Sequence, residues 1–235
     1  MILGFVSDAH GNPEGLGRCL RALRASGAET IYFLGDAVGY MPEENAVMAL
    51  LFAENALCIR GNHEEMLLGS LEVTAAREQV YKLADARARI APEFRAAIES
   101  WPLTRELDVE GARFLLVHGS PSDPVGGYVY PDSDLGPFRD LPYAAVLMGQ
   151  THRPFVSSSG DVTVVNIGSS GMPRDVGNLA SCATYDTAAG AWEILRIDFD
   201  AGALLSRFGD RIDPSVAACL QRQSSAPVVG RVVAL

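Results

Sequence analysis

The alternation of apolar runs with amphipathic stretches in its first sixty residues constrains the fold of this chain more than any other feature. Runs of strand-forming residues begin the segments 2–10, 30–36 and 56–63, and each run breaks into polar residues at its carboxyl end. The stretches 13–29 and 42–55 between them carry apolar residues at helical spacing. This order of strands and helices predicts βαβ units and a parallel sheet.

Short strands dominate the second half of the chain. Helices are predicted over 74–90 and 92–101, and residues 104–119 predict a hairpin that turns at Glu110-Gly111. Together with the first half, this pattern predicts two mixed sheets with helices outside them. Further strands, linked by Gly, Ser and Asp turns, are predicted over 143–149, 154–159, 161–168, 179–186 and 191–200.

Two segments stand apart from this pattern. A loop over residues 119–143, rich in Pro, Gly and Asp, is long for a compact domain, and loops of that length are commonly functional or disordered. We expect it to lie near the functional site. The tail over 211–235 carries a short helical pattern at 214–223, and its last segment, 224–235, is expected to dock as an edge strand or to fray. We expect one domain over residues 1–235, of class α/β (α+β), with an accessory tail.

Charge and composition narrow the function. The formal net charge is −10 at pH 7, so no basic face is expected to carry binding to a nucleic acid polymer. We find no run of ~18 apolar residues that could span a bilayer, and the first residues lack the basic segment of a signal peptide. Four scattered cysteines without a C-x-x-C pair indicate reduced thiols. We expect a cytoplasmic protein without a membrane partner, and no feature indicates an oligomer.

Residues that carry chemistry follow the predicted strands, at or just past their carboxyl ends. In open α/β sheets this edge is where ligand sites lie. A single histidine there is more often structural, but all four histidines of the chain occupy such positions, which predicts a metal cluster. Oxygen and nitrogen ligands without cysteine suit Mn, Fe, Mg or Zn rather than a thiolate site. The residues at these strand ends are Asp8, His10, Asp36, Asn62, His63, His118 and His152.

These residues fall into short blocks with a fixed order. The order resembles that of the calcineurin-like metallophosphoesterases, whose pattern is D-x-H, G-D, G-N-H, a lone H and then G-H-x-H, and the resemblance runs from residue 2 to about 200. The runs "GDAVGY", "HGSP" and "NIGSSGMPRD" are similar to the bacterial branch of small phosphodiesterases and diadenosine polyphosphate hydrolases. The five blocks are "SDAH" at 7–10, "LGD" at 34–36, "RGNHE" at 60–64, "VHG" at 117–119 and "GQTH" at 149–152.

The resemblance implies a four-layer αββα sandwich and two divalent metal ions, with Mn favoured and Fe, Mg, Zn or Ni as alternatives. It also implies that His63 is catalytic, stabilising the phosphoryl group or protonating the leaving oxygen. A structural or metal contact is the alternative for His63, and Glu64 and Glu65 either orient it or simply begin a helix. The implied ligands are Asp8, His10, Asp36 and His152 for the first metal, and Asp36, Asn62, His118 and Gln150 for the second.

Gln150 departs from the family pattern, which has a histidine at this position. An amide oxygen is a poorer ligand than imidazole for Zn²⁺. We therefore expect Gln150 to favour Mn²⁺, Mg²⁺ or Fe in the second position, or to leave that position loosely filled. The alternative is that Gln150 only hydrogen-bonds a metal-bound water.

Three residues are candidates for substrate binding. Arg174 and Arg153 lie on loops close in sequence to the strand-end residues, and arginine suits bidentate contacts with phosphate. Surface or structural salt bridges are the alternative for both. Tyr128, with its neighbour Tyr130 in the long loop, could stack on a nucleobase or could pin the loop to the core.

The function that these features favour is hydrolysis of phosphate ester or anhydride bonds in small phosphorylated molecules. A hydroxide that bridges two metal ions would attack phosphorus, and nucleotides or dinucleoside polyphosphates are the preferred substrates. Phosphoprotein phosphatases of the superfamily carry G-D-x-V-D-R-G, whereas this chain has Gly39 and Tyr40 in place of the Asp and Arg. A phosphoprotein phosphatase is therefore the weaker alternative. A non-catalytic interaction scaffold is another, against which the retained ligands and His63 argue.

Overall fold

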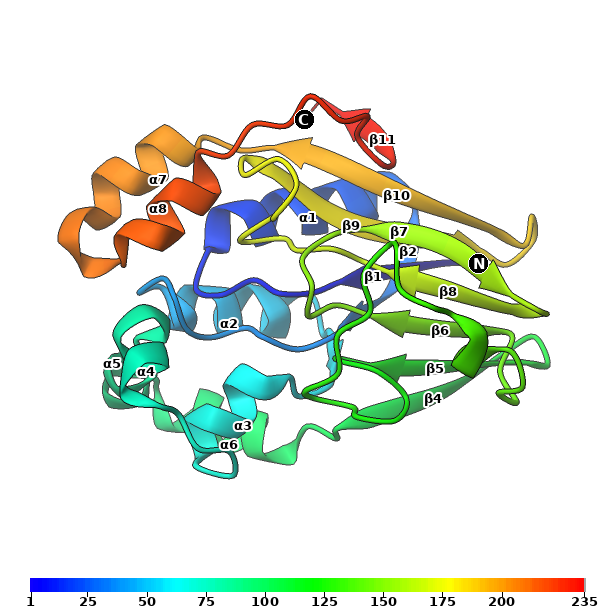
Figure 1. Cartoon of the computed structure of the whole chain (residues 1–235), viewed down its shortest axis with the longest axis horizontal. Coiled ribbons are helices and arrows are strands. Elements are labelled where there is room, and N and C mark those ends of the chain that lie inside the picture. The colour runs from blue at the N-terminus through cyan, green and yellow to red at the C-terminus, as the bar shows by residue number, and fades with distance from the viewer. Residues whose placement is uncertain (235) are drawn as a thin grey trace.

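A computed structural model describes residues 1–234 and places their strands in two sheets that pack face to face (Figure 1). The first sheet has the order β11-β10-β9-β1-β2-β3, and in it β1 pairs in parallel with β2 and antiparallel with β9. Its strands are β1 (Ile2–Val6), β2 (Ala28–Phe33), β3 (Leu57–Cys58), β9 (Leu179–Asp186), β10 (Ala191–Asp198) and β11 (Arg231–Val233).

The second sheet has the order β4-β5-β6-β8-β7 and is also mixed. The predicted hairpin forms its edge, and β5 then pairs in parallel with β6, which pairs in parallel with β8. Its strands are β4 (Thr104–Val109), β5 (Ala112–Val117), β6 (Ala145–Met148), β7 (Phe155–Ser159) and β8 (Val162–Asn166).

Helices follow the strands of the first sheet. α1 begins at Pro13, where the Asn12 side chain accepts hydrogen bonds from the backbone N–H groups of Glu14 and Gly15 at 3.2 and 3.1 Å. The helices are α1 (Pro13–Ala25), α2 (Glu44–Ala53), α3 (Asn62–Leu68), α4 (Ala75–Tyr81), α5 (Leu83–Arg89), α6 (Pro92–Ser100), α7 (Ala201–Phe208) and α8 (Pro214–Leu220), with single 3-10 turns η1 (Gly136–Phe138) and η2 (Gly209–Arg211).

Three apolar clusters account for the layers. The cluster between the sheets contains Phe5 and Tyr32, which stack at 5.3 Å, and Phe114 from the second sheet. The largest cluster lies between the first sheet and the helices. The outer face of the second sheet is covered by loop 119–143, through buried side chains that include Val129 and Phe138. The predicted α/β class with two packed mixed sheets and outer helices is thus confirmed, and a Pro- and Gly-rich loop with one 3-10 turn replaces helices on one face.

Several local predictions differ from the structure. Segment 74–90 is two helices rather than one, because Lys82 has a left-handed backbone (φ 56°) between α4 and α5. The strand predicted at 56–63 shortens to β3, because the chain enters α3 at Asn62. Helix α7 was not predicted. In the tail, β11 pairs in parallel with β10, so the edge-strand alternative is confirmed as far as residue 234.

Candidate metal centre

The predicted strand-end residues come together in one cluster, where the loops after β1, β2, β5 and β6 meet the start of α3 (Figure 1). Asp8, His10 and His118 are completely buried, and Asn62 is half-buried. Three groups of side chains offer ligand atoms within 4.8 Å of one another. The groups are Asp8, His10 and His152; Asp8, Asp36 and His118; and His10, Asp36 and His63.

Backbone carbonyls orient three of the histidines. Each of these rings has Nδ1 against a carbonyl oxygen, and because a carbonyl only accepts, Nδ1 carries the proton. When such a ring is neutral, its Nε2 presents a lone pair to the cluster, and this is the tautomer that binds a metal through Nε2. The Nδ1-to-oxygen distances are 3.2 Å from His10 to Val38, 2.7 Å from His118 to Leu34 and 2.6 Å from His152 to Met172.

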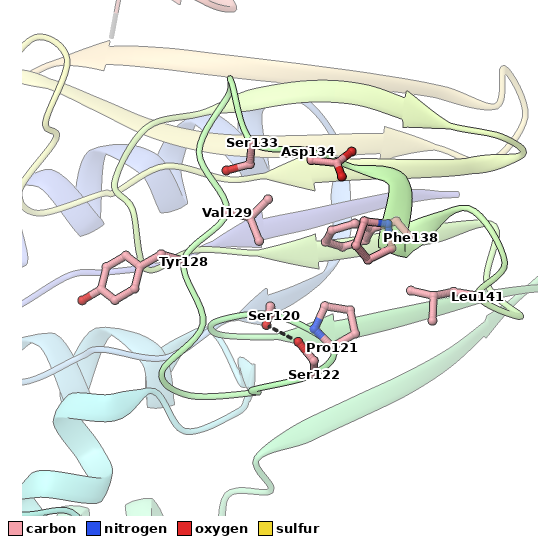
Figure 2. A pocket seen from close by; sticks show the side chains of 10 residues that line it. Ser120, Pro121, Ser122, Tyr128, Val129, Ser133, Asp134, Phe138 and Leu141 are labelled. Carbon is pink, nitrogen blue, oxygen red and sulfur yellow. Dashed lines mark hydrogen bonds between the residues drawn. The ribbon is translucent and has the colours of Figure 1, made fainter.

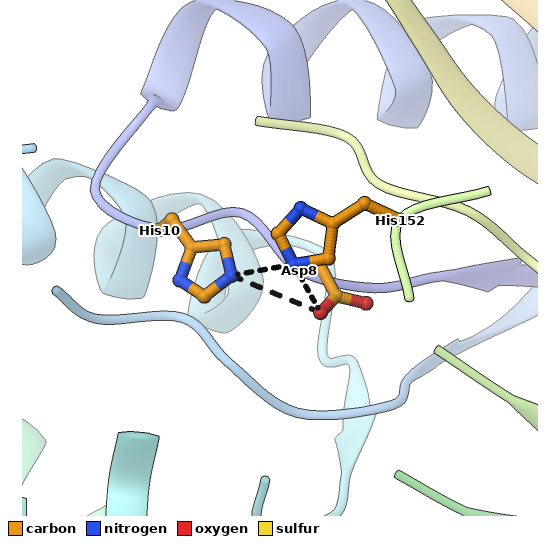
Figure 3. Close-up of side chains that lie close together, drawn as sticks. All are labelled: Asp8, His10 and His152. Atoms are coloured by element: carbon orange, nitrogen blue, oxygen red, sulfur yellow. Dashed lines mark hydrogen bonds and ion pairs between the residues drawn. The ribbon is translucent and has the colours of Figure 1, made fainter. Parts of the chain in front are cut away.

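The first group consists of two imidazoles and one carboxylate, from His10, His152 and Asp8, as Figure 3 shows. The Nε2 atoms of His10 and His152 face each other at 3.1 Å. Oδ1 of Asp8 lies 3.2 Å from Nε2 of His152 and 3.8 Å from Nε2 of His10. Two imidazole lone pairs at this distance repel unless positive charge lies between them. Asp8 Oδ1, although buried, has no well-aligned hydrogen-bond donor in the described part of the chain. These atoms therefore fit a divalent cation.

The second group centres on His118. Its Nε2 lies 3.3 Å from Oδ2 of Asp36, 3.2 Å from Oδ1 of Asn62 and 3.1 Å from Oε1 of Gln150. The amide nitrogen of Gln150 donates to the carbonyl of Val125 at 3.0 Å, so its oxygen is the atom that faces the cluster. One carboxylate oxygen and two amide oxygens thus lie within 3.3 Å of one imidazole nitrogen, and this donor set suits a hard cation such as Mn²⁺ or Mg²⁺.

The electrostatics of the cluster favour positive charge. Burial would raise the pKa of the Asp8 and Asp36 carboxyls, but the facing histidines hold the pKa of both well below the usual range. Burial would lower the pKa of His118, but Asp36 and Asp8 raise it to about 10. Burial and the charge of Arg174 lower the pKa of His152 to about 4. Two buried carboxylates therefore supply negative charge that a cation would balance.

His63 lies over this cluster in an aromatic stack. Its ring is 4.9 Å from Tyr40, 4.6 Å from Tyr81 and 4.6 Å from His10, measured between ring centres. Its backbone N–H donates to Oδ1 of Asp36 at 2.9 Å. Burial lowers the pKa of His63 to about 3, which favours the neutral ring.

Gly39 makes room for the His63 ring. Gly39 has φ +87°, and a Cβ there would come within 2.4 Å of His63 Nδ1. Tyr40, the next residue, stacks on the ring. The two residues that depart from the phosphoprotein phosphatase pattern are therefore the ones that shape the pocket of His63, and an Asp at position 39 would clash with it.

Glu64 acts on the backbone rather than on the His63 ring. Its buried carboxylate accepts hydrogen bonds from the backbone N–H groups of Asp36, Ala37 and Gly61, at 2.7, 2.8 and 2.8 Å. It therefore holds the loop after β2 against the start of α3 and fixes Asp36 beside Asn62. Glu65, by contrast, forms an ion pair with Arg60 at 2.9 Å.

The ligand loops have an unusual backbone. Left-handed φ values are uncommon for residues other than glycine, and they cluster at functional sites when the surrounding structure fixes them. Contacts between loops supply that support, since the amide nitrogen of Asn12 donates to the carbonyl of Gly171 at 2.8 Å and a Cβ on Gly171 would lie 1.8 Å from the carbonyl oxygen of Ala9. The candidate ligands with left-handed φ are Asp8 (54°), His10 (48°), Asp36 (61°), Gln150 (63°) and His152 (58°).

The candidate substrate residues surround the cluster without joining it. Arg153 is exposed, whereas Arg174 is half-buried and donates its backbone N–H to the carbonyl of His152 at 3.2 Å. Arg222, which was not predicted to lie near the site, follows α8. Its guanidinium donates a hydrogen bond of 2.8 Å to the carbonyl of Arg174. Tyr128 is half-exposed, and burial together with Tyr81 raises its pKa while Arg174 opposes that rise.

Sequence reasoning missed Tyr40 and Tyr81 as packing partners of His63, and it left the role of Glu64 open. In the sequence, Tyr40 stands out only as a departure from a family motif. Tyr81 ends α4, and no local pattern indicates that this helix reaches a site built from strand ends. The only signal for Glu64 was its place next to His63. Contacts between segments far apart in sequence define all three roles.

Comparisons with known proteins agree with this fold. An uncharacterised protein of Methanocaldococcus jannaschii is 28% identical over 218 residues, which are 85% of this chain and 88% of that protein. A crystal structure of a hypothetical protein from Pyrococcus horikoshii has a TM-score of 0.81 at 20% identity, covering 96% of this chain and 99% of that one. A metallophosphoesterase from Sphaerobacter thermophilus has a TM-score of 0.81 at 21% identity, covering 94% and 98%.

The family model is more specific than these folds. The model of the calcineurin-like phosphoesterase superfamily domain matches residues 1–190, which carry every predicted ligand. None of the helices described is both long and apolar enough to cross a bilayer. The chain therefore belongs to the calcineurin-like phosphoesterase superfamily and is a metallophosphoesterase.

Proposed function

We propose that this protein is a dinuclear metal-dependent hydrolase of phosphate ester or anhydride bonds in small phosphorylated molecules, with nucleotides and dinucleoside polyphosphates preferred. The observation that carries the proposal is the convergence of three imidazole Nε2 atoms on two buried carboxylates, with each Nδ1 already engaged by a carbonyl. Asp8, His10, Asp36 and His152 would hold one ion, and Asp36, Asn62, His118 and Gln150 the other.

Each part of the site has a chemical task. Two divalent cations, when bound, neutralise phosphate charge and lower the pKa of water, which provides a nucleophile near neutral pH. Asp36 lies between the two groups, because its Oδ2 is 3.6 Å from His10 Nε2 and 3.3 Å from His118 Nε2. The amide oxygens of Asn62 and Gln150 favour Mn²⁺ or another hard cation over Zn²⁺.

His63 would donate a hydrogen bond from its ring to the phosphoryl group. Its buried, aromatic surroundings favour the neutral imidazole, which still has one N–H to donate. This supports the phosphoryl-binding role over protonation of the leaving oxygen. The two roles are separable, since loss of a general acid costs more for a poor leaving group than for p-nitrophenolate.

Arg174 and Arg153 would bind phosphate oxygens beside the metal ligands. In the described residues neither side chain forms an ion pair with a carboxylate, so both guanidinium groups are free to contact an anion. Both arginines are next to His152. Arg153 follows it in the sequence, and Arg174 donates its backbone N–H to the carbonyl of His152. Their charge lets an acidic protein bind a substrate with more than one phosphate.

A substrate panel tests the proposal. Purified protein would be assayed with phosphomonoesters, linear and cyclic diesters, dinucleoside polyphosphates and a phosphopeptide, with Mn²⁺ and with EDTA. We expect Mn²⁺-dependent turnover of the small molecules that EDTA abolishes. Preferred turnover of the phosphopeptide would indicate a phosphoprotein phosphatase, and no metal-dependent turnover of any compound would indicate a scaffold.

A further inference from the structure

Loop 119–143 encloses a cavity that the metal centre does not use. Its volume is about 380 Å³, within the range of small-molecule pockets. Figure 2 shows its side chains, which lie on the outer face of the second sheet. Its floor is apolar, with Val129, Phe138 and Leu141, and hydroxyl groups and one carboxylate stand around it. The lining is Ser120, Pro121, Ser122, Tyr128, Val129, Ser133, Asp134, Pro137, Phe138 and Leu141.

The cavity and the metal centre share one stretch of chain. The loop begins directly after His118, and Ser120, two residues on, lines the cavity. The carbonyl of Val125 holds the Gln150 amide, which presents its oxygen to the cluster. The same loop therefore contributes both to the cavity and to the placement of a candidate metal ligand.

Tyr128 provides a flat wall at the entrance. Its ring stacks on Tyr130 with centres 6.1 Å apart and planes 14° apart, and it is 51% exposed. A paired, half-exposed aromatic surface is the kind on which a nucleobase stacks without sequence preference.

The polar groups around the cavity favour groups that donate hydrogen bonds over phosphate. Asp134 is exposed, and one of its oxygens accepts the backbone N–H of Gly136 at 2.9 Å, which leaves the other available. The hydroxyl of Ser122 has only that of Ser120 as a partner among the described residues, at 3.3 Å. A carboxylate at the rim repels phosphate but accepts hydrogen bonds from amino and ring N–H groups, as hydroxyls also do.

From these observations we infer that the cavity is a nucleoside-binding subsite, in which a nucleobase stacks on Tyr128. The phosphate joined to that nucleoside lies at the metal centre, near Arg174. This inference rests on the proposed function for the reaction, but the cavity binds a nucleoside whether or not metal is present. Its substrate class is nucleoside phosphate esters and anhydrides.

Two measurements test the subsite. The first is calorimetric titration of metal-free protein in EDTA with adenosine and with thymidine, which carry no phosphate. The second compares kcat/KM, with Mn²⁺, for thymidine 5′-(p-nitrophenyl phosphate) and methyl p-nitrophenyl phosphate, which release the same leaving group. The variants are Tyr128→Ala and Tyr128→Phe, with Leu141→Trp to fill the cavity from its far end. Tyr143→Ala, at a tyrosine outside the lining, is the matched control.

We expect both nucleosides to bind and the thymidine ester to be preferred. Tyr128→Ala should weaken nucleoside binding and reduce the preference by about tenfold, whereas Tyr128→Phe and Tyr143→Ala should retain both. Leu141→Trp should reduce both as well. Nucleoside binding that depends on Tyr128 without any turnover would uphold the subsite and refute the proposed function. Turnover with equal kcat/KM for the two esters, and no nucleoside binding, would overturn the subsite alone.

Discussion

The two halves of the candidate metal centre differ in the quality of their ligands. The half around His152 combines imidazoles with a fully buried carboxylate, and its histidines are oriented by carbonyls of the rigid core loops. The half around His118 has two amide oxygens, and one of them, from Gln150, is held by loop 119–143. The stronger half is therefore built into the fold, whereas the weaker half depends on the loop that also forms the nucleoside cavity. Metal binding at the second position and substrate binding should be linked.

The largest effect is expected where the two halves meet. Asp36→Asn removes the carboxylate that faces both His10 and His118, so we predict loss of metal from both positions and a fall in turnover of at least about a thousandfold. Metal content by mass spectrometry and turnover of p-nitrophenyl phosphate check this. Asp161→Asn, in an exposed turn, is the control. An Asp36→Asn protein that keeps both ions would refute the proposal that Asp36 is a ligand of both metals.

His63→Ala should separate chemistry from metal binding. We expect turnover to fall by about 10²–10⁴-fold with metal content unchanged, because in the proposed function His63 contacts the substrate rather than an ion. If His63 stabilises the phosphoryl group, alkyl and p-nitrophenyl esters should lose the same factor. A larger loss for the alkyl ester would assign leaving-group protonation instead. Loss of an ion would make His63 a ligand, as its position near His10 and Asp36 also permits.

Arg174→Ala should weaken substrate binding rather than metal binding. A hydrogen bond to a charged group contributes about 1.5–3 kcal/mol, so we predict that KM rises by about tenfold or more. The rise should be larger for a substrate with several phosphates than for a monoester. Arg139→Ala, at an exposed arginine of the long loop, should leave KM unchanged, and equal KM values for Arg174→Ala and the parent protein would remove Arg174 from the site.

Glu64→Gln should loosen the contact between the loop after β2 and the start of α3. One of the three backbone N–H groups would face an amide N–H₂ instead of a carboxylate oxygen, and we predict a loss of about 1–3 kcal/mol in the free energy of unfolding. Chemical denaturation of the metal-free protein measures it. Glu65→Gln, which breaks only the ion pair with Arg60, is the neighbouring control and should cost less. Equal losses would mean that the three hydrogen bonds are not what holds the loops together.

The smallest effect is expected from a change at Gln150, the ligand that distinguishes the second metal position from the first. Gln150→His should strengthen binding at the second position, above all for Zn²⁺, because imidazole is a better ligand than an amide for that ion. Competitive metal titration of the variant and the parent protein measures the change. Identical curves for both proteins would mean that Gln150 does not coordinate the metal and only hydrogen-bonds water.

The sequence was informative about the cluster because parallel strands end at a common edge. Asp8, Asp36 and His118 follow apolar runs directly, so their convergence is a consequence of topology. The hairpin at Glu110 was predictable for a different reason, since local turn chemistry determines it. Sequence patterns of this kind report short-range structure and the edge at which strands end.

The remaining features depend on contacts across long sequence distances. Tyr81 packs on His63, and Arg222 binds the carbonyl of Arg174, 48 residues away in sequence. The break at Lys82 depends on a single left-handed residue within a helical pattern. The cavity under the long loop has apolar residues that follow no period, because the loop is irregular. Neither periodicity nor motif spacing carries this information.

The most direct test of the two-metal centre is anomalous X-ray scattering at the manganese edge from crystals of the protein grown with Mn²⁺. We expect two peaks on either side of Asp36, one beside His10 and His152 and the other beside His118 and Gln150, with the second peak weaker. A single peak, or a pair of peaks that do not share Asp36, would contradict this expectation.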